Sequence, residues 1–255
     1  MTLETTTMPS VEVQAYLDEL LRVSADEGGG EGLVIAGRQA VGKVGLAVNC
    51  SVESIEQAIQ RGCDMLVTHH AARPRTDAYL AEQKHEQLRE RGMNLYVAHD
   101  SLDNARDFGT ADALARAVRV AIQAPVEPDG ENQFGVHGVT TGGFADFVAR
   151  VGNRLGIEPR IWKNSVDFGH VGIVAGWGAR PEWMARAQSL GVDTFLSGEA
   201  GYFGLLFAKE AGLNLVLAGH YGTEVPGVMA LGARIARDLH LDVTFIPEEV
   251  LEGKS

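Results

Sequence analysis

Short apolar runs alternate with amphipathic stretches along most of the chain. Runs such as 43–48, 65–68 and 215–218 are typical of strands buried in a sheet. In segments such as 107–120 and 226–239 the apolar residues recur at helical spacing, which predicts helices with one buried face. This regular exchange of strand and helix patterns predicts an α/β fold in layers.

A cluster of turn-forming residues interrupts this alternation near the middle of the chain. The segment Pro125–Asn132 contains two prolines and an Asp-Gly pair, and such residues mark turns and loops. We therefore expect a first α/β lobe over residues 1–124 and a second α/β segment over residues 125–255.

Imidazole and carboxylate side chains follow three of the predicted strands. Ligands bind at the carboxyl ends of strands in α/β sheets, and imidazole with carboxylate is a common ligand set for divalent transition metals. A metal centre is therefore the leading hypothesis. The side chains concerned are His69, His70, His99, Asp103, His220 and Glu224.

Each of these residues also has an ordinary structural alternative. Adjacent side chains on a strand point to opposite faces, so His69 and His70 can share one site only if the backbone leaves the sheet there. Otherwise they are solvent-facing loop histidines. Asp103 could instead cap a helix or form an Asx-turn.

Sequence signals for the start of a helix predict where His220 and Glu224 lie. Thr223 suits an N-cap and Pro226 a first helical turn, so we expect His220 in a loop and Glu224 in the first turn. The alternative is a surface histidine and a glutamate favoured by the helix dipole.

The combined set contains more ligands than one metal ion uses. A mononuclear zinc site takes three or four protein ligands, whereas five, with a carboxylate able to bridge, fit two metals about 3.5–4 Å apart. The five are His69, His70, Asp103, His220 and Glu224. We expect His99 to be an outer hydrogen-bond partner. Mixed nitrogen and oxygen ligands suit zinc, iron, manganese or nickel.

Charge and composition narrow the classes of partner. The formal net charge is −12, and no run of Lys or Arg offers a surface for nucleic acid or anionic membranes. No segment is apolar for long enough to span a bilayer, and the first ten residues lack the features of a signal peptide. We expect a cytoplasmic protein whose two cysteines, Cys50 and Cys63, are buried reduced thiols.

Four blocks of sequence resemble the NIF3-like (DUF34) family, some of whose members carry the name GTP cyclohydrolase I type 2. The blocks are 64–70, 98–105, 196–202 and 217–227. The resemblance implies one intertwined unit of two facing α/β lobes, with mixed sheets flanked by helices and a dinuclear metal site between them. It also implies a toroidal homohexamer and the same five ligands. Departures from the family pattern include Asn49, where Asp is frequent.

We therefore expect a metal-dependent hydrolase that activates water for attack on a nucleotide or a phosphate ester. Glu199 or His99 could accept or relay the proton. The principal alternative is a non-catalytic regulatory module that presents a ring-shaped surface to a partner protein. A third possibility is metal storage with weak, exchangeable binding.

Overall fold

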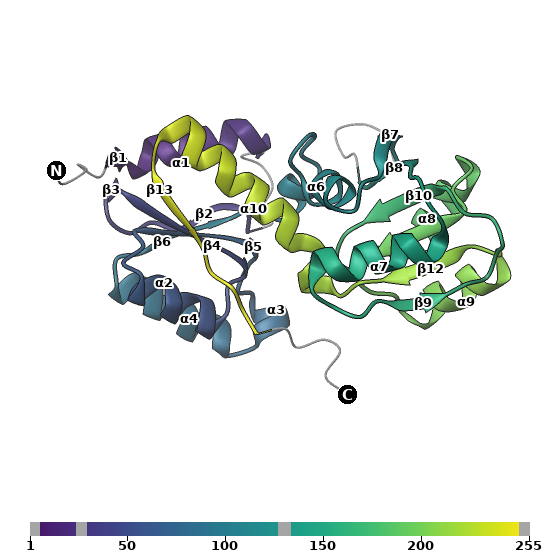
Figure 1. The fold of residues 1–255 in the computed structure, drawn as a ribbon. Coiled ribbons are helices and arrows are strands. Elements are labelled where there is room, and N and C mark those ends of the chain that lie inside the picture. The colour runs from purple at the N-terminus through teal and green to yellow at the C-terminus, as the bar shows by residue number, and fades with distance from the viewer. Residues whose placement is uncertain (1–5, 24–29, 127–133, 250–255) are drawn as a thin grey trace. The chain divides into compact units, whose positions relative to one another are not determined.

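The computed structural model describes residues 6–23, 30–126 and 134–249 (Figure 1). Contacts divide the chain into two compact units. Unit 1 comprises residues 1–102 and 228–249, and unit 2 comprises residues 103–227 and 250–255. This division differs from the two consecutive segments expected from sequence, because the C-terminal strand returns to the sheet of unit 1. Most of the turn-rich segment at 125–132 lies outside the described residues.

Unit 1 is built on a five-stranded sheet with the strand order β13-β4-β5-β6-β2. β13, β4, β5 and β6 are parallel, and β2 is antiparallel at one edge. A separate two-stranded pair, β1 with β3, precedes β4. The bounds are β1 (Met8–Pro9), β2 (Gly32–Ile35), β3 (Ala40–Val41), β4 (Lys43–Asn49), β5 (Met65–His70), β6 (Asn94–Val97) and β13 (Asp242–Phe245).

Helices cover both faces of this sheet, with α2 and α4 on one side and α1 and the end of α10 on the other (Figure 1). Ile55 of α2 and Leu88 of α4 are fully buried against apolar side chains of the strands, including Leu66 and Leu95. On the other side Tyr16 of α1 donates a hydrogen bond to Asp238 of α10. The bounds are α1 (Ser10–Leu21), α2 (Val52–Gln60), α3 (Pro74–Asp77), α4 (Leu80–Glu90), α5 (Asp100–Asp103) and α10 (His220–Leu239).

Unit 2 contains a six-stranded mixed sheet with the order β7-β8-β10-β11-β12-β9. Its central strands β10, β11 and β12 are parallel, and the flanking strands are antiparallel to their neighbours. The strands are β7 (Ala121–Pro125), β8 (Val136–Val139), β9 (Arg160–Trp162), β10 (His170–Val174), β11 (Thr194–Ser197) and β12 (Asn214–Leu217).

The unit 2 sheet has an apolar core on each of its two faces. On one face α6 and α7 pack with Leu114 and Phe147 against the strands. On the other face α8 and α9 pack with Met184 and Ala208 against Phe195 and its neighbours. The helices are α6 (Thr110–Ala117), α7 (Phe144–Leu155), α8 (Pro181–Ser189) and α9 (Tyr202–Glu210). The expected α/β class with helix-covered mixed sheets is confirmed.

The pattern over 77–91 predicts a helix, and the structure has α4 from Leu80 to Glu90 within that span. A separate short helix, α3, ends at Asp77. Ala78 between them has a φ of 51°, a left-handed conformation that interrupts a right-handed helix. Within the described residues no helix is both long and apolar enough to cross a bilayer.

Candidate metal centre

His69 and His70 are the last two residues of β5, so the strand continues through both of them. The strand ends at His70, so the pair lies at a strand end, where the sequence predicts that both side chains can reach one site. His69 is buried, at 1% exposure, and His70 is half-buried. Their ring centroids are nevertheless only 4.8 Å apart, at an interplanar angle of 43°. The pair therefore faces a common region at the carboxyl end of the unit 1 sheet.

His99 completes a group of three imidazoles in unit 1. It follows β6, the neighbour of β5 in the sheet, and its ring stacks on that of His69 with centroids 4.8 Å apart. One nitrogen from each of the three rings lies within 4.8 Å of the others. The carboxyl ends of two neighbouring parallel strands thus bring these three residues together.

In each of the three rings Nδ1 faces an oxygen atom. Nδ1 of His69 lies 2.7 Å from the carbonyl oxygen of Ala98, and Nδ1 of His70 lies 2.7 Å from Oδ1 of Asn49. Nδ1 of His99 lies 2.8 Å from Oδ1 of Asp100. A carbonyl or carboxylate oxygen only accepts, so in the neutral ring these contacts place the proton on Nδ1 and leave the lone pair on Nε2. This is the arrangement in which histidine binds a metal through Nε2.

Two carboxylates near His99 were not among the residues predicted from sequence. Glu31, His99 and Asp100 offer ligand atoms within 4.8 Å of one another. The hydrogen bond from His99 holds the pKa of the Asp100 carboxyl below its usual range. Asp100 follows His99 just after β6, so its place at a strand end was a signal that could have found it. Glu31 precedes β2, and the pattern of strand ends gives no signal for it.

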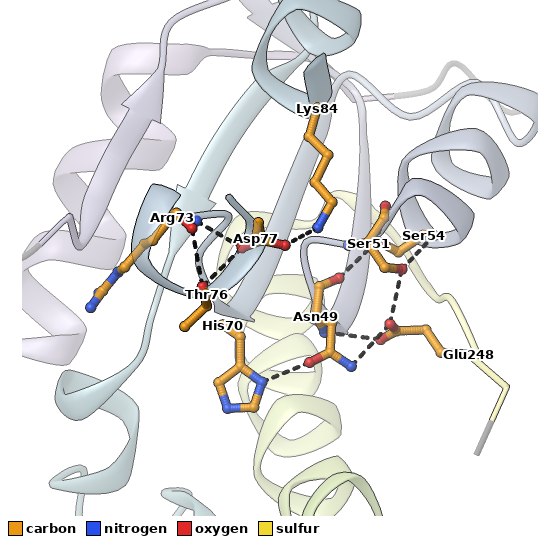
Figure 2. Close-up of polar contacts among 9 residues, drawn as sticks. All are labelled: Asn49, Ser51, Ser54, His70, Arg73, Thr76, Asp77, Lys84 and Glu248. Carbon is orange, nitrogen blue, oxygen red and sulfur yellow. Dashed lines mark hydrogen bonds and ion pairs between the residues drawn. The ribbon is translucent and has the colours of Figure 1, made fainter. Parts of the chain in front are cut away.

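The loop that follows His70 is held by its own polar contacts (Figure 2). Asp77 accepts hydrogen bonds from the backbone nitrogen of Arg73 and from Oγ1 of Thr76, both at 2.9 Å. Lys84 of α4 forms an ion pair with the same carboxylate. These contacts hold the short helix α3, which begins four residues after His70, and join it to α4.

In unit 2 His220 and Glu224 lie on one helix rather than in a loop and a first turn. α10 begins at His220 and contains Pro226, so the prediction of a helix starting at Pro226 is wrong. A proline at this position loses one backbone hydrogen bond, to the Gly222 carbonyl, and the rest of the helix tolerates that loss. The spacing of four residues puts both side chains on one face, with Nε2 of His220 3.1 Å from Oε1 of Glu224.

Glu199 joins these two residues from the end of β11. Its Oε1 lies 3.3 Å from Nδ1 of His220, on the opposite side of the ring from Glu224. Glu224 is buried, whereas the side chain of Glu199 is 43% exposed. A carboxylate on Nδ1 orients an imidazole whose Nε2 faces the site, so Glu199 has a positioning contact in addition to its predicted role.

The loop after β10 forms hydrogen bonds with the segments that carry Glu199 and His220. The backbone nitrogen of Gly176 donates to Oγ1 of Thr223 at 3.0 Å, and its carbonyl accepts from the backbone nitrogen of Glu199 at 2.9 Å. Oγ1 of Thr223 in turn donates to a carbonyl oxygen at the start of α10, that of His220 or Gly219. One loop therefore ties β11 to the first turn of α10.

Asp103, the remaining predicted ligand, is the last residue of α5. Thr110 at the start of α6 donates a hydrogen bond from Oγ1 to Oδ1 of Asp103 at 2.5 Å. Thr110 is buried, so this contact fixes the carboxylate at one oxygen. The contact joins the end of α5 to the start of α6.

The donor set of each unit suits a divalent transition metal. Unit 1 brings together His69, His70 and His99. Unit 2 places His220 beside Glu224 at Nε2, with Glu199 at the other ring nitrogen. Neutral imidazoles with defined tautomers and buried carboxylates are the ligands that zinc, iron, manganese and nickel take in proteins. That the five predicted ligands act as one site stays a prediction.

Comparison with known proteins identifies the family. The family model described as Duf34/NIF3 (NGG1p interacting factor 3) matches residues 8–250, nearly the whole chain. The chain belongs to the Duf34/NIF3 family. A relative from Deinococcus radiodurans named "GTP cyclohydrolase 1 type 2 homolog" is 30% identical over 242 residues, covering 92% of this chain and 91% of the relative. A relative of the same name from Escherichia coli K12 is 28% identical, with coverages of 94% and 98%.

Two solved structures align with nearly the whole chain. The protein ybgI, of unknown function, has a TM-score of 0.86 at 25% identity, covering 95% of this chain and all of its own. Reduced HcgD from Methanocaldococcus jannaschii has a TM-score of 0.83 at 25% identity, with coverages of 96% and 100%. The resemblance inferred from four sequence blocks is therefore confirmed at the level of family and fold.

Proposed function

We propose that this Duf34/NIF3 protein is a metal-dependent hydrolase that holds two divalent ions. Its ligands would be His69, His70, Asp103, His220 and Glu224. The observation that carries the proposal is the group of three imidazoles in unit 1. Each presents Nδ1 to an oxygen, and nitrogens from the three rings lie within 4.8 Å of one another.

The geometry of unit 2 supports the same proposal. His220 has a carboxylate near each ring nitrogen, Glu199 at Nδ1 and Glu224 at Nε2. A buried carboxylate such as Glu224 is costly to keep beside an imidazole unless a cation or proton compensates its charge. His220 and Glu224 would hold a divalent ion, which would supply that charge.

The substrate class that fits this site is a small anion, such as a nucleotide or a phosphate ester. Two bound divalent ions would stabilise charge on the attacked centre and lower the pKa of a water molecule from ~15.7 toward ~7. Glu199 or His99 would then accept and relay its proton. The curated relatives carry the name "GTP cyclohydrolase 1 type 2 homolog", which makes GTP the first nucleotide to test.

Metal content is the measurement that tests this proposal. Protein purified without chelators is compared by elemental analysis with a His69→Ala/His220→Ala double variant and with His240→Asn, a control at an exposed histidine. We expect about two metal ions per chain in the wild type and the control. The double variant should have lost its bound metal. Absence of metal after reconstitution with zinc, iron, manganese and nickel would overturn the hydrolase proposal.

A regulatory role without catalysis is the second candidate. The family description, NGG1p interacting factor 3, names an interaction. On α9 Tyr202 and Phe203 are 73% and 72% exposed, and such adjacent aromatic side chains suit a protein contact. If this candidate holds, metal binds and raises thermal stability while nucleotides and phosphate esters are not turned over. The expected homohexamer also remains a proposal, to be tested by light scattering after gel filtration.

A further inference from the structure

Asn49, at the end of β4, is the register partner of His70 on the neighbouring strand β5. The sheet itself therefore sets the two side chains beside one another, and Nδ1 of His70 lies 2.7 Å from Oδ1 of Asn49. A primary amide can present either oxygen or nitrogen to the ring. Which one it presents decides which ring nitrogen of His70 carries the proton.

A carboxylate from the C-terminal end of unit 1 decides this orientation. Glu248 follows β13, the strand on the other side of β4, and its Oε2 lies 3.1 Å from Nδ2 of Asn49 (Figure 2). Oε2 also accepts a hydrogen bond from Oγ of Ser51 at 3.1 Å. Because an ionised carboxylate only accepts, the amide nitrogen of Asn49 must face Glu248, which leaves Oδ1 facing His70.

Glu248 is itself fixed by the backbone of β4. The ladder between β13 and β4 ends where the nitrogen of Ile246 donates to the carbonyl of Leu46 at 2.7 Å. Beyond that point Oε1 of Glu248 accepts from the backbone nitrogens of Val48 and Asn49, at 3.1 Å and 2.9 Å. The side chain thus replaces the next backbone acceptor of the ladder.

We propose that Glu248 and Asn49 are positioning residues that fix the tautomer and ring orientation of His70. Glu248 sets the amide of Asn49, and the amide accepts the Nδ1 proton of His70. Nε2 is thereby presented as the ligand nitrogen. The inference rests on the proposed function only where it predicts metal affinity, because the tautomer exists in the metal-free protein.

The variant that tests this role most directly is Glu248→Gln. The new side chain keeps an oxygen for the two backbone nitrogens of β4 but turns an amide nitrogen toward Nδ2 of Asn49. Two donors then face each other, which favours a flip of the Asn49 amide. Its nitrogen would point at His70, and the proton of the ring would move from Nδ1 to Nε2. Asn49→Ala removes the oxygen that accepts from Nδ1 of His70, and Asn49→Asp keeps an oxygen at that position.

The direct test is a nitrogen-15 NMR measurement of the histidine tautomers in metal-free protein, with His70 assigned from a His70→Gln spectrum. We expect the Nδ1-protonated form in wild type and Asn49→Asp, a mixture in Asn49→Ala, and the Nε2-protonated form in Glu248→Gln. Glu56→Gln, on the exposed face of α2, is the matched control and should resemble wild type. A wild-type tautomer in both folded Asn49→Ala and Glu248→Gln would overturn the proposal.

Competition of Zn²⁺ between the protein and a chromophoric chelator gives the second readout. Loss of an outer hydrogen-bond partner of a ligand typically weakens metal affinity by about 10- to 100-fold, and we expect this for Asn49→Ala and Glu248→Gln. Thermal unfolding identifies a variant that merely fails to fold. If the tautomers change as expected but even the wild type binds no Zn²⁺, the positioning role stands and the proposed function fails. Unchanged Zn²⁺ affinity beside changed tautomers would refute the link to metal binding.

Discussion

Gly176 lies so close to Glu224 that a Cβ on the glycine would run into Oε1 of the carboxylate. The glycine has a φ of 59°, which other residues rarely adopt. The same Cβ would also come within 3.1 Å of Nε2 of His220. The absence of a side chain at this position therefore leaves the room in which His220 and Glu224 face each other.

Gly176→Ala should displace the Glu224 carboxylate and lower the affinity for Zn²⁺. Gly212→Ala is the matched control, because Gly212 has a similar φ of 66° but a Cβ there would have no neighbouring atom within 4 Å. Both variants carry the left-handed strain of about 1–2 kcal/mol, measurable by urea unfolding. Only Gly176→Ala should lose Zn²⁺ affinity, and equal affinities in the two variants would contradict the role assigned to this contact.

Thr110→Val should weaken Zn²⁺ binding through Asp103. The variant keeps the shape of the buried side chain but removes the donor to Oδ1 of Asp103. We expect the free energy of unfolding to fall by about 1.5–3 kcal/mol, the typical contribution of a hydrogen bond to a charged group. Thr110→Ser retains the hydroxyl and should retain the affinity. Isothermal titration with Zn²⁺ compares the two, and a valine variant that binds like wild type would exclude this contact from the site.

The histidines of unit 1 could be located from sequence because parallel strands end at one edge of a sheet. His69 and His70 on β5 and His99 after β6 are neighbours because these two strands pair in parallel. The apolar runs predict where each strand ends, and the histidines stand at those ends. The start of α10 was harder to predict. Thr223 and Pro226 are strong local signals for a helix beginning near residue 223, yet the helix begins at His220 and carries the proline inside it. Tertiary contacts of Thr223 with the Gly176 loop outweigh that local preference.

The contacts that support the ligands had no local signal at all. Glu248 is separated from Asn49 by 199 positions in the sequence, and only the parallel pairing of β13 with β4 brings them together. Nothing in the residues around Glu248 distinguishes it from Glu249. Pairing between distant strands is a property of the folded sheet, so the outer partners of His70 could be identified only in the structure.

Both cysteine thiols should be unreactive in the folded protein. Burial raises the pKa of Cys50 and of Cys63 to about 11, and their exposures are 3% and 2%. At pH 8 the reactive thiolate is therefore scarce and inaccessible. Reaction with a chromogenic disulfide reagent should be slow in buffer and should reveal two thiols per chain in denaturant. Rapid labelling of the native protein would show that the unit 1 core around these residues opens readily.

Acidification should destabilise unit 2 through His137. This residue lies 2.9 Å, Nδ1 to Nε2, from His170, and burial followed by the charge of His170 lowers its pKa below 6.5. The unfolded chain then binds the proton more readily than the folded one, so stability is complete above pH 6.5 and is lost as the pH falls toward the lower, folded pKa. The midpoint of thermal unfolding, measured between pH 7.5 and 5.5, should fall less steeply in His137→Gln. His240→Asn should keep the wild-type slope.

Glu199→Gln separates catalysis from metal binding. The glutamine oxygen can still accept a hydrogen bond from Nδ1 of His220, so the ring should keep its orientation and the metal content should stay that of wild type. The amide cannot accept a proton. For a residue that acts as general base we expect kcat on a nucleotide substrate, GTP first, to fall by about 10²–10⁴-fold with little change in KM. If the metal content falls together with kcat, Glu199 acts by positioning His220 instead. If kcat is unchanged, the proton passes elsewhere, and His99→Gln becomes the variant that should lose activity.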